Sequence, residues 1–429
     1  MIKLIVQHSA KLIEFLVLLQ LSLSKPQYRH VTRLADAVIV SESPHKTLTS
    51  LYNLIVDAPD ASNAADCLRI SPWTANDLRE PLRDFTMRDL LQAAHSLPGE
   101  ALFVSIDDSL TAKDKGTRHL EPVCWQYDHT KAGSKKTAYT NGTVHIEVRI
   151  QLGGQAYVYD WALYLREKIV RRLNRRRAVG RRLRFRSKYN LVRPILADLK
   201  RRLPARFPVY VLFDSWYASA KLIKYCRRQH WHVLCALKSN RTLDGVKLSK
   251  WNQRLKHQPY TRVYPAATDR RKRPYLVRAL QGRLKNVPQE VCVLISKRHR
   301  GDKRPKYFLS TDLNLSPQQI LTFYSKRWPV EVDNFYVKQL LGLGDFRVQS
   351  VEAVEKWFAI VFLAYTYLQW RFNHAAPASR LKSVADIIRL HRQEHARRLL
   401  QASCELAIHC QDMAQVLRRF IHQSSRPAT

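Results

Sequence analysis

Two short apolar runs, residues 209–213 and 233–237, constrain the fold more than any other feature. Neither run contains a charged side chain, which is typical of strands buried on both faces of a parallel sheet. A helical pattern covers residues 217–229 between them, and a third apolar run, residues 101–106, precedes both. Because crossover connections are right-handed, we expect the two later strands to run parallel to the first. The pattern predicts an α/β fold.

A hairpin is expected between the first strand and the other two. From residue 144 to residue 152, apolar residues alternate with polar ones such as His145, Glu147 and Arg149. Alternation with a period of two predicts a strand with one face in the core and its polar face toward solvent. A glycine pair then marks a two-residue turn, and residues 155–161 return as the partner strand.

Changes of pattern divide the chain into five expected segments. Apolar residues recur at helical spacing near the N-terminus, and strand-like runs joined by basic turns follow the core strands. The segments are a helical N-terminal domain that could contact DNA (1–98), the first part of the core (99–238), a β-rich insertion (239–314), the last part of the core with the helix that carries Glu331 (315–375), and a basic helical C-terminal tail (376–429).

The charge balance indicates a polyanionic partner. The chain has 73 Lys and Arg against 35 Asp and Glu, a net charge of +38, and its pI is about 10.3. Such an excess attracts nucleic acid and speeds the encounter with it. A solubilising surface is the ordinary alternative, but solubility does not require so strong a bias toward one sign.

Cysteine and histidine patterns give no sign of a disulfide framework or a structural zinc site. The seven cysteines include no Cys-x-x-Cys pair, and the 16 histidines show no metal-ligand spacing. The scattered cysteines indicate a reducing compartment. The apolar N-terminus is interrupted by charges and is followed by no cleavage site, and the uncharged run 357–370 is too short to span a bilayer comfortably. We therefore expect a cytoplasmic protein.

Three distant acids are the candidate catalytic residues. Asp107 and Asp214 each follow an apolar run, and Glu331 lies in a helical segment. The carboxyl ends of parallel strands meet at one edge of a sheet, where open α/β sheets bind their ligands. Carboxylates on separate elements can hold two Mg²⁺ ions, which suits phosphodiester chemistry. Asp108 adjoins Asp107, and only one of them can face the metals because side chains alternate along a strand; we favour Asp107.

The segment around Glu331 carries three further polar residues at fixed intervals. Tyr324, Arg327, Glu331 and Lys338 have two, three and six residues between them. At 100° per residue, Arg327, Glu331 and Lys338 form one stripe of a helix with Tyr324 beside it, so a helix that aims a carboxylate at a metal would aim these cations at the same DNA. Pro329 is expected to kink this helix or to begin a new one.

With this signature, residues 100–372 resemble an insertion-sequence transposase of the DDE class, the branch with the Tyr-Arg-Glu-Lys motif. The resemblance implies an RNase H-like mixed sheet flanked by helices, with a β-rich insertion before the last acid. It implies cut-and-paste chemistry: cleavage at terminal inverted repeats and joining of the 3′ ends to a target. The implied catalytic and metal-binding triad is Asp107, Asp214 and Glu331. The family usually has threonine two positions after the first acid, where this chain has Ser109.

The resemblance also implies cofactors and partners. Mg²⁺ would be bound as two ions, with Mn²⁺ as a substitute, and no small-molecule cofactor is expected. The partners would be double-stranded DNA, at element ends and target, and a second copy of the chain on paired ends, in the bacterial nucleoid. The expected DNA-binding residues are Tyr324, Arg327, Lys338, Arg175, Arg176, Arg181, Arg182, Arg298, Arg300, Lys303 and Arg304.

Each feature also has an ordinary explanation. An Asp after a strand often caps the next helix, and a helical Glu often pairs with an Arg one turn away on the surface. The basic segment 171–186 could be a disordered loop, and the basic residues 297–306 could form a solvated turn. An inactive DNA-binding derivative and a stand-alone nuclease of the same fold stay open as alternative functions. The acids, the topology, the signature and the charge together favour the transposase.

Overall fold

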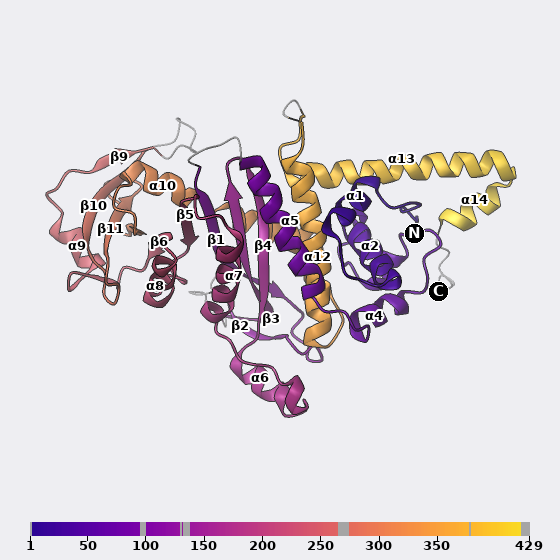
Figure 1. The fold of residues 1–429 in the computed structure, drawn as a ribbon, viewed down its shortest axis with the longest axis horizontal. Helices are drawn as coiled ribbons and strands as arrows, with labels where there is room; N and C mark the ends of the chain where they lie inside the picture. The colour runs from indigo at the N-terminus through magenta and orange to yellow at the C-terminus, as the bar shows by residue number, and fades with distance from the viewer. Residues whose placement is uncertain are drawn as a thin grey trace.

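The computed structural model describes residues 2–94, 100–128, 131, 138–264, 274–376 and 379–421. A long mixed sheet occupies the middle and one end of the molecule, and a helical unit occupies the other end (Figure 1). The expected boundary at residues 98 and 99 lies outside the described residues, as does the end of the C-terminal tail. The architecture is mixed α/β, with a central mixed sheet flanked by helices, as the sequence pattern predicts.

The strands form one ten-stranded sheet and one two-stranded sheet. The large sheet has the order β2-β3-β1-β5-β6-β12-β11-β10-β9, with β4 paired to β3. Its strands are β1 (Leu102–Ala112), β2 (Cys124–Tyr127), β3 (Tyr139–Leu152), β4 (Gln155–Tyr164), β5 (Val209–Phe213), β6 (His232–Leu237), β9 (Thr261–Val263), β10 (Tyr275–Arg283), β11 (Glu290–Lys297) and β12 (Lys306–Ser310). The small sheet pairs β7 (Thr242–Leu243) with β8 (Val246–Lys247).

The parallel centre of the sheet confirms the prediction from the apolar runs. β1 pairs with β5 in parallel, and β5 pairs with β6 in parallel. Every side chain of β5 is buried, as expected for a strand covered on both faces. Helix α8 (Ala220–Arg228) makes the crossover from β5 to β6. The hairpin is also confirmed, with β3 and β4 joined at Gly153 and Gly154; Gly153 has a φ of 58°.

The first strand is longer than expected. The apolar run predicts that it ends at Asp107, yet β1 continues to Ala112. Its pairing with β5 stops at Ile106 and Phe213, whereas its antiparallel pairing with β3 continues from Asp107 to Ala112. The long hairpin strand therefore carries β1 past the parallel sheet, and Asp107 lies inside a strand that has lost one of its two neighbours.

The expectation that the polar face of β3 meets solvent is wrong. His145, Glu147 and Arg149 are 0%, 0% and 9% exposed. Helices from much later in the chain cover them: α11 (Pro329–Phe335) supplies acceptors for His145 and Arg149, and α12 (Val351–Asn373) packs two phenylalanines against His145. The alternating pattern shows which side chains of β3 share a face. It does not show which distant helices will cover that face in the folded protein.

The segment expected as a β-rich insertion continues the central sheet. β12 pairs with β6 in an antiparallel register, and β11, β10 and β9 follow in turn. Strands β7 to β12 lie within residues 239–314, and β12, β11, β10 and β9 extend the hydrogen-bonded ladder beyond β6. Helix α9 (Leu248–Arg254) lies at this end of the molecule (Figure 1).

Helices cover the sheet around the acids. α7 (Lys188–Arg202) packs on β3 and β4, and α10 (Pro317–Ser325) packs on the other face, where Phe323 contacts Phe103 edge-on at 5.0 Å. Lys188 pairs with Asp108 on the α7 face. Asp107 points the opposite way, toward the turn between α10 and α11. The two adjacent acids therefore serve different faces of β1.

The helical ends of the chain pack together. The N-terminal helices are α1 (Ala10–Leu19), α2 (Lys25–Val40), α3 (Leu48–Tyr52), α4 (Ala61–Arg69) and α5 (Asn76–Ala94), and the C-terminal helices are α13 (Val384–Cys410) and α14 (Met413–Phe420). α12 joins both groups, with contacts to α2, α4, α5 and α13. Among the described residues, no helix is long and apolar enough to cross a membrane.

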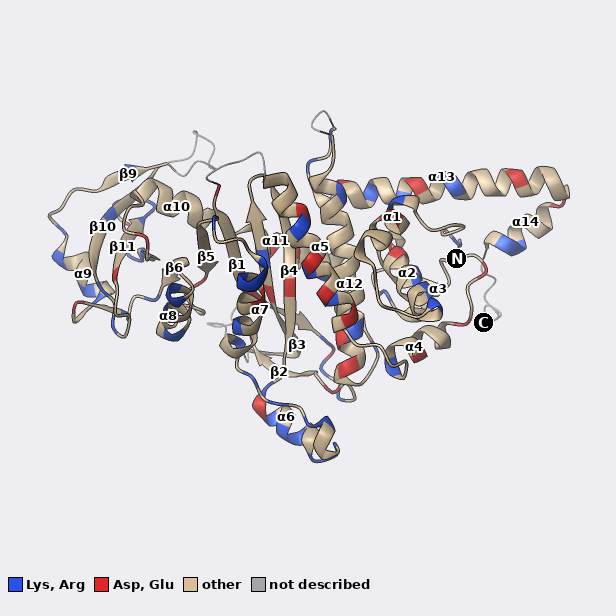
Figure 2. Cartoon of the chain, in the orientation of Figure 1, with Lys and Arg blue, Asp and Glu red and all other residues tan. Residues whose placement is uncertain are grey.

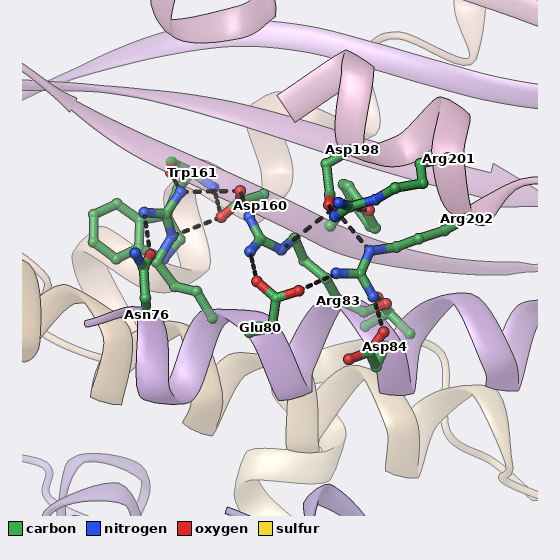
Figure 3. Close-up of polar contacts among 12 residues, drawn as sticks. Asn76, Glu80, Arg83, Asp84, Asp160, Trp161, Asp198, Arg201 and Arg202 are labelled. Atoms are coloured by element: carbon green, nitrogen blue, oxygen red, sulfur yellow. Dashed lines mark hydrogen bonds and ion pairs between the residues drawn. The ribbon is translucent and has the colours of Figure 1, made fainter. Parts of the chain in front are cut away.

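A buried polar cluster docks α5 on the sheet (Figure 3). Asp160 in β4 has a side chain that is 1% exposed and accepts hydrogen bonds from Arg79 at 2.8 and 2.9 Å and from Arg83 at 2.9 Å. Arg83 also pairs with Glu80 and lies 3.4 Å from Asp198 in α7. One carboxylate thus connects the N-terminal helices to the core.

Candidate active site

Two neighbouring strands bring Asp107 and Asp214 together. Ile106 and Phe213 form the last parallel pair of β1 and β5, so the two acids are the next residues on each strand. Asp214 Oδ1 accepts the backbone N–H groups of Trp216 at 2.9 Å and Tyr217 at 3.2 Å. Asp214 therefore does cap the following turn. Both of these hydrogen bonds are accepted by Oδ1.

Helix α11 brings Glu331 to the same place. Pro329 occupies the first turn of α11, so of the two expectations for this proline, the new helix is the one that occurs. Arg327 lies in the connection just before it. Its Nη1 contacts Asp107 Oδ2 at 3.0 Å, and its Nη2 donates to Glu331 Oε1. The Glu–Arg pair exists, but the arginine is only 11% exposed and also binds the strand acid.

The electrostatics of this group favour a bound cation. Burial raises the pKa of the Asp107 carboxyl to about 7; the Arg327 guanidinium opposes this rise, and the nearby charge of Asp214 adds to it. Burial also opposes the charge of Arg327, yet its pKa is raised overall by Tyr324, Asp107 and Glu331. The charged form of Asp107 is therefore disfavoured despite its contact with Arg327, and a divalent ion with oxygen ligands would stabilise it.

The other two signature residues, Tyr324 and Lys338, are half-buried and contact neighbouring elements. Lys338 Nζ donates to Ser109 Oγ at 3.1 Å and to the Leu110 carbonyl at 2.8 Å. A π-helical turn, Tyr336–Leu340, follows α11 and carries this lysine. Burial raises the pKa of Tyr324 to about 12, and its ring lies 4.9 Å from that of Phe308. The structure thus places Lys338 against β1, where it holds the strand that carries Asp107.

The part of the chain around these residues matches a known family. Residues 186–367 match the family model of the transposase DDE domain. This match supports a transposase of the DDE class. No curated protein matches the chain. The matched range contains Asp214, Glu331 and the whole signature, and it begins after Asp107.

A cavity adjoins the signature residues Tyr324 and Arg327. It has a volume of about 270 Å³ and lies between the β11–β12 turn and the connection from α10 to α11. Arg298 and Arg304 line it from the turn, and Tyr324, Arg327 and Trp328 line it from the helices. The expected basic turn therefore reaches the neighbourhood of Glu331, although the two segments are far apart in sequence.

The remaining expected DNA-binding residues lie on the surface. Arg298, Arg300, Lys303 and Arg304 are exposed on the β11–β12 turn. A second group follows α6 (Glu167–Asn174), which extends away from the sheet and carries several blue residues in Figure 2. Its exposed members are Arg175, Arg176, Arg181 and Arg182. Within the basic segment 171–186, α6 ends at Asn174 and a 3₁₀ turn covers Val179–Arg181, and residues 182–186 have no regular secondary structure.

Sequence reasoning missed a layer of buried acids beside the site. Glu147 pairs with Asp107 across β3 and β1 and is fully buried, and neither of its carboxylate oxygens has a hydrogen-bond partner. Burial raises its pKa well above the usual range, and Asp333 and Asp107 add to the rise. Asp333 contacts Arg149 Nε at 2.8 Å and accepts from Tyr365 at 2.6 Å. The one signal available was the acid at the centre of the polar positions that alternate along β3.

Proposed function

We propose that this chain is a DNA transposase that cleaves at the terminal inverted repeats of its own insertion sequence and joins the 3′ ends to target DNA. The observation that carries the proposal is the meeting of Asp107, Asp214 and Glu331. One guanidinium, that of Arg327, binds two of these acids, and the charge of the third acts on Asp107. The match of residues 186–367 to a transposase domain supports it independently.

The donor set fits divalent cations. Transposases of this class depend on divalent metals, and Asp107, Asp214 and Glu331 would hold two Mg²⁺ ions, with Mn²⁺ as a substitute. When bound, such ions activate the attacking oxygen and stabilise charge on the phosphodiester. The acids fix the position of the ions, and Arg327 holds the strand and helix acids in register. We also propose assembly as a dimer on paired element ends.

DNA would lie across both basic groups that flank the acids. The exposed arginines after α6 would contact phosphates, which gives affinity without reading sequence. Arg298 and Arg304 would continue the contact near Glu331, because they line the cavity beside the signature. Lys338 is bonded to β1, so we propose that it supports the site and that Arg327 and the surface arginines make most of the DNA contacts.

The phosphate contacts can be counted by salt dependence. Replacing Arg175 and Arg176 by alanine should lower the slope of log K against log salt by about 1.8, because each lost phosphate contact contributes roughly 0.9. Arg177 is the matched control. Its guanidinium pairs with Glu121 at 2.8 Å and with Glu352, so Arg177→Ala should leave the slope unchanged. Equal salt-dependence slopes for the double variant and the parent would show that Arg175 and Arg176 do not contact DNA phosphates.

One experiment separates the proposed function from its two alternatives. The protein is incubated with its own element ends and Mg²⁺ or Mn²⁺, and nicked, hairpin and joined products are resolved. Joined products support transposition, whereas cleavage without joining indicates a plain nuclease. Binding without cleavage indicates a DNA-binding derivative. The variant Glu331→Gln should lose every product, and unchanged products would show that the assigned site is wrong; Asp66→Asn, an exposed acid in α4, is the control.

A further inference from the structure

A second group of metal-ligating side chains lies far from the three acids. Asp36 in α2 and His391 and His395 in α13 are 0%, 0% and 1% exposed. The Nε2 atoms of His391 and His395 lie 2.7 and 3.0 Å from Asp36 Oδ1, and all three donor atoms fall within 4.8 Å of one another. No metal-ligand spacing is identified among the histidines from the sequence, whereas the structure brings His391 and His395 together with Asp36.

The local geometry resembles a transition-metal site. Two histidines four residues apart on one helix present their rings on the same side, the arrangement by which helical histidine pairs bind zinc. Zinc bonds to imidazole nitrogen and carboxylate oxygen are about 2.0–2.2 Å, so tetrahedral donors lie roughly 3.3 Å apart. The two distances from Asp36 Oδ1 to the histidine nitrogens, 2.7 and 3.0 Å, would need to lengthen by about 0.3–0.6 Å to admit the ion.

The surroundings already orient each donor. Tyr367 in α12 lies 3.2 Å from His391 Nδ1, so it can accept from the ring nitrogen that faces away from the ion. His8 Nδ1 lies 2.8 Å from the second oxygen of Asp36. Hydrogen bonds of this kind to a ligating histidine and carboxylate fix ring and carboxylate positions and increase metal affinity. His8 is also the one partly exposed member, at 27%, and so marks a route from solvent.

The site is suited to holding structure together. Glu394, the acid between the two histidines, pairs with Arg371 at 3.0 Å and is not part of the cluster. The Glu394 carboxylate is therefore held by Arg371 and does not act as a ligand in this arrangement. The buried stripe of α13 ends at His395, and beyond it the helix extends outward over the N-terminal unit (Figure 1). The cluster therefore includes the last two fully buried side chains of α13.

We propose that Asp36, His391 and His395 bind one structural Zn²⁺ ion that ties the C-terminal helix to the N-terminal helical unit. The fourth position is taken by water or by His8. This ion is distinct from the Mg²⁺ of the catalytic acids, since imidazole ligands select zinc whereas carboxylates and water select magnesium. The rival interpretation is a metal-free network in which the imidazoles donate to the Asp36 carboxylate.

Zinc content of the full-length protein tests the site. The protein is loaded with ZnCl₂, desalted and analysed for metal, and one equivalent is expected in the parent chain. His391→Gln should weaken zinc binding by at least tenfold, since ligand loss removes one of three protein donors. His409→Gln is the matched control, because it removes an exposed histidine from the same helix. Asp214→Asn should also retain one equivalent, which excludes the carboxylate site.

X-ray absorption at the zinc edge of the parent protein needs no variant, so it remains decisive if His391→Gln fails to fold. Two or three imidazoles among the ligands support the proposal. Chelation of the ion should then lower the midpoint of thermal unfolding and expose the end of α13 to protease. A parent protein that binds no zinc at micromolar concentration, or one whose zinc has oxygen ligands alone, overturns it in favour of the hydrogen-bond network.

Discussion

Asp107→Asn should reduce metal-dependent DNA cleavage by about a thousandfold. A metal-binding carboxylate supports charge stabilisation of several kcal/mol in the transition state, and each 1.36 kcal/mol corresponds to a factor of ten in rate. Asparagine keeps the shape of the side chain and removes its charge. The initial rate of strand cleavage on element ends in Mg²⁺, with DNA affinity measured in parallel, is the readout. Affinity should change little, because Asp107 is a small part of the DNA interface.

Asp108→Asn is the matched control, since it makes the same change one residue further along β1. Asp108 pairs with Lys188 at 2.6 Å on the opposite face, so its loss should cost less than about tenfold in rate. A larger loss for Asp108→Asn than for Asp107→Asn would assign the first ligand to Asp108. The comparison matters because the family match begins after both residues.

Thermal unfolding distinguishes a lost ligand from a damaged fold. Burial raises the pKa of Asp107 to about 7 in the folded chain, above its ordinary value in the unfolded chain. A group of this kind makes folding less favourable as pH rises from about 4 to about 7, because the unfolded chain ionises more easily. At pH 8, in the absence of divalent metal, Asp107→Asn should therefore unfold at the same temperature as the parent or higher. If the variant unfolds at a lower temperature than the parent, its loss of activity is explained by a destabilised fold.

The sequence predicts the parts of the fold that local pattern decides. The continuous apolar residues of β5 and β6 identify buried parallel strands, and the glycine pair identifies the β3–β4 turn. The parallel order then places Asp107 and Asp214 on neighbouring strands. These predictions succeed because a buried strand requires apolar side chains on both faces, and a tight turn requires glycine at positive φ.

The remaining features depend on contacts between distant segments. β1 continues to Ala112 because β3 offers it a partner, and nothing in the polar residues after Asp107 indicates that pairing. Glu147 is buried because α11, nearly two hundred residues later in the chain, closes over β3. The insertion continues the sheet because β12 meets the edge of β6. In each of these three cases the strand forms as its sequence pattern predicts. Its length, burial or pairing is then determined by a segment that is distant in sequence.

The candidate site follows the same division. The three acids and the signature are visible in the sequence, because their residue types and intervals suit metal-dependent chemistry. The bridging position of Arg327 is not visible, since it requires Asp107 and Glu331 to lie on either side of one guanidinium. The orientation of Lys338 toward Ser109 is likewise a consequence of packing α11 on β1.

Asp160→Asn should lower the free energy of unfolding by about 3–5 kcal/mol, the usual effect of removing one partner from a buried ion pair. Asp160 is 1% exposed and is bonded to Arg79 and Arg83. An asparagine amide would leave both guanidiniums partly buried without their shared carboxylate, and its NH₂ group would face their donors. Denaturant unfolding of the full chain measures the change. The parent and the variant are compared provided that their unfolding free energies depend on denaturant concentration with the same slope.

Glu80→Gln is the control, because it removes a charge from the same cluster at a position that is 51% exposed. Solvent screens an exposed pair, so the expected change is about 1 kcal/mol or less. Similar effects for both variants would mean that the cluster in Figure 3 acts as a surface ion-pair network. A large effect for Asp160→Asn alone would show that this carboxylate holds the N-terminal helices on the sheet. In that case cleavage by Asp160→Asn should fall only at temperatures or denaturant concentrations near its unfolding transition, unlike cleavage by Asp107→Asn.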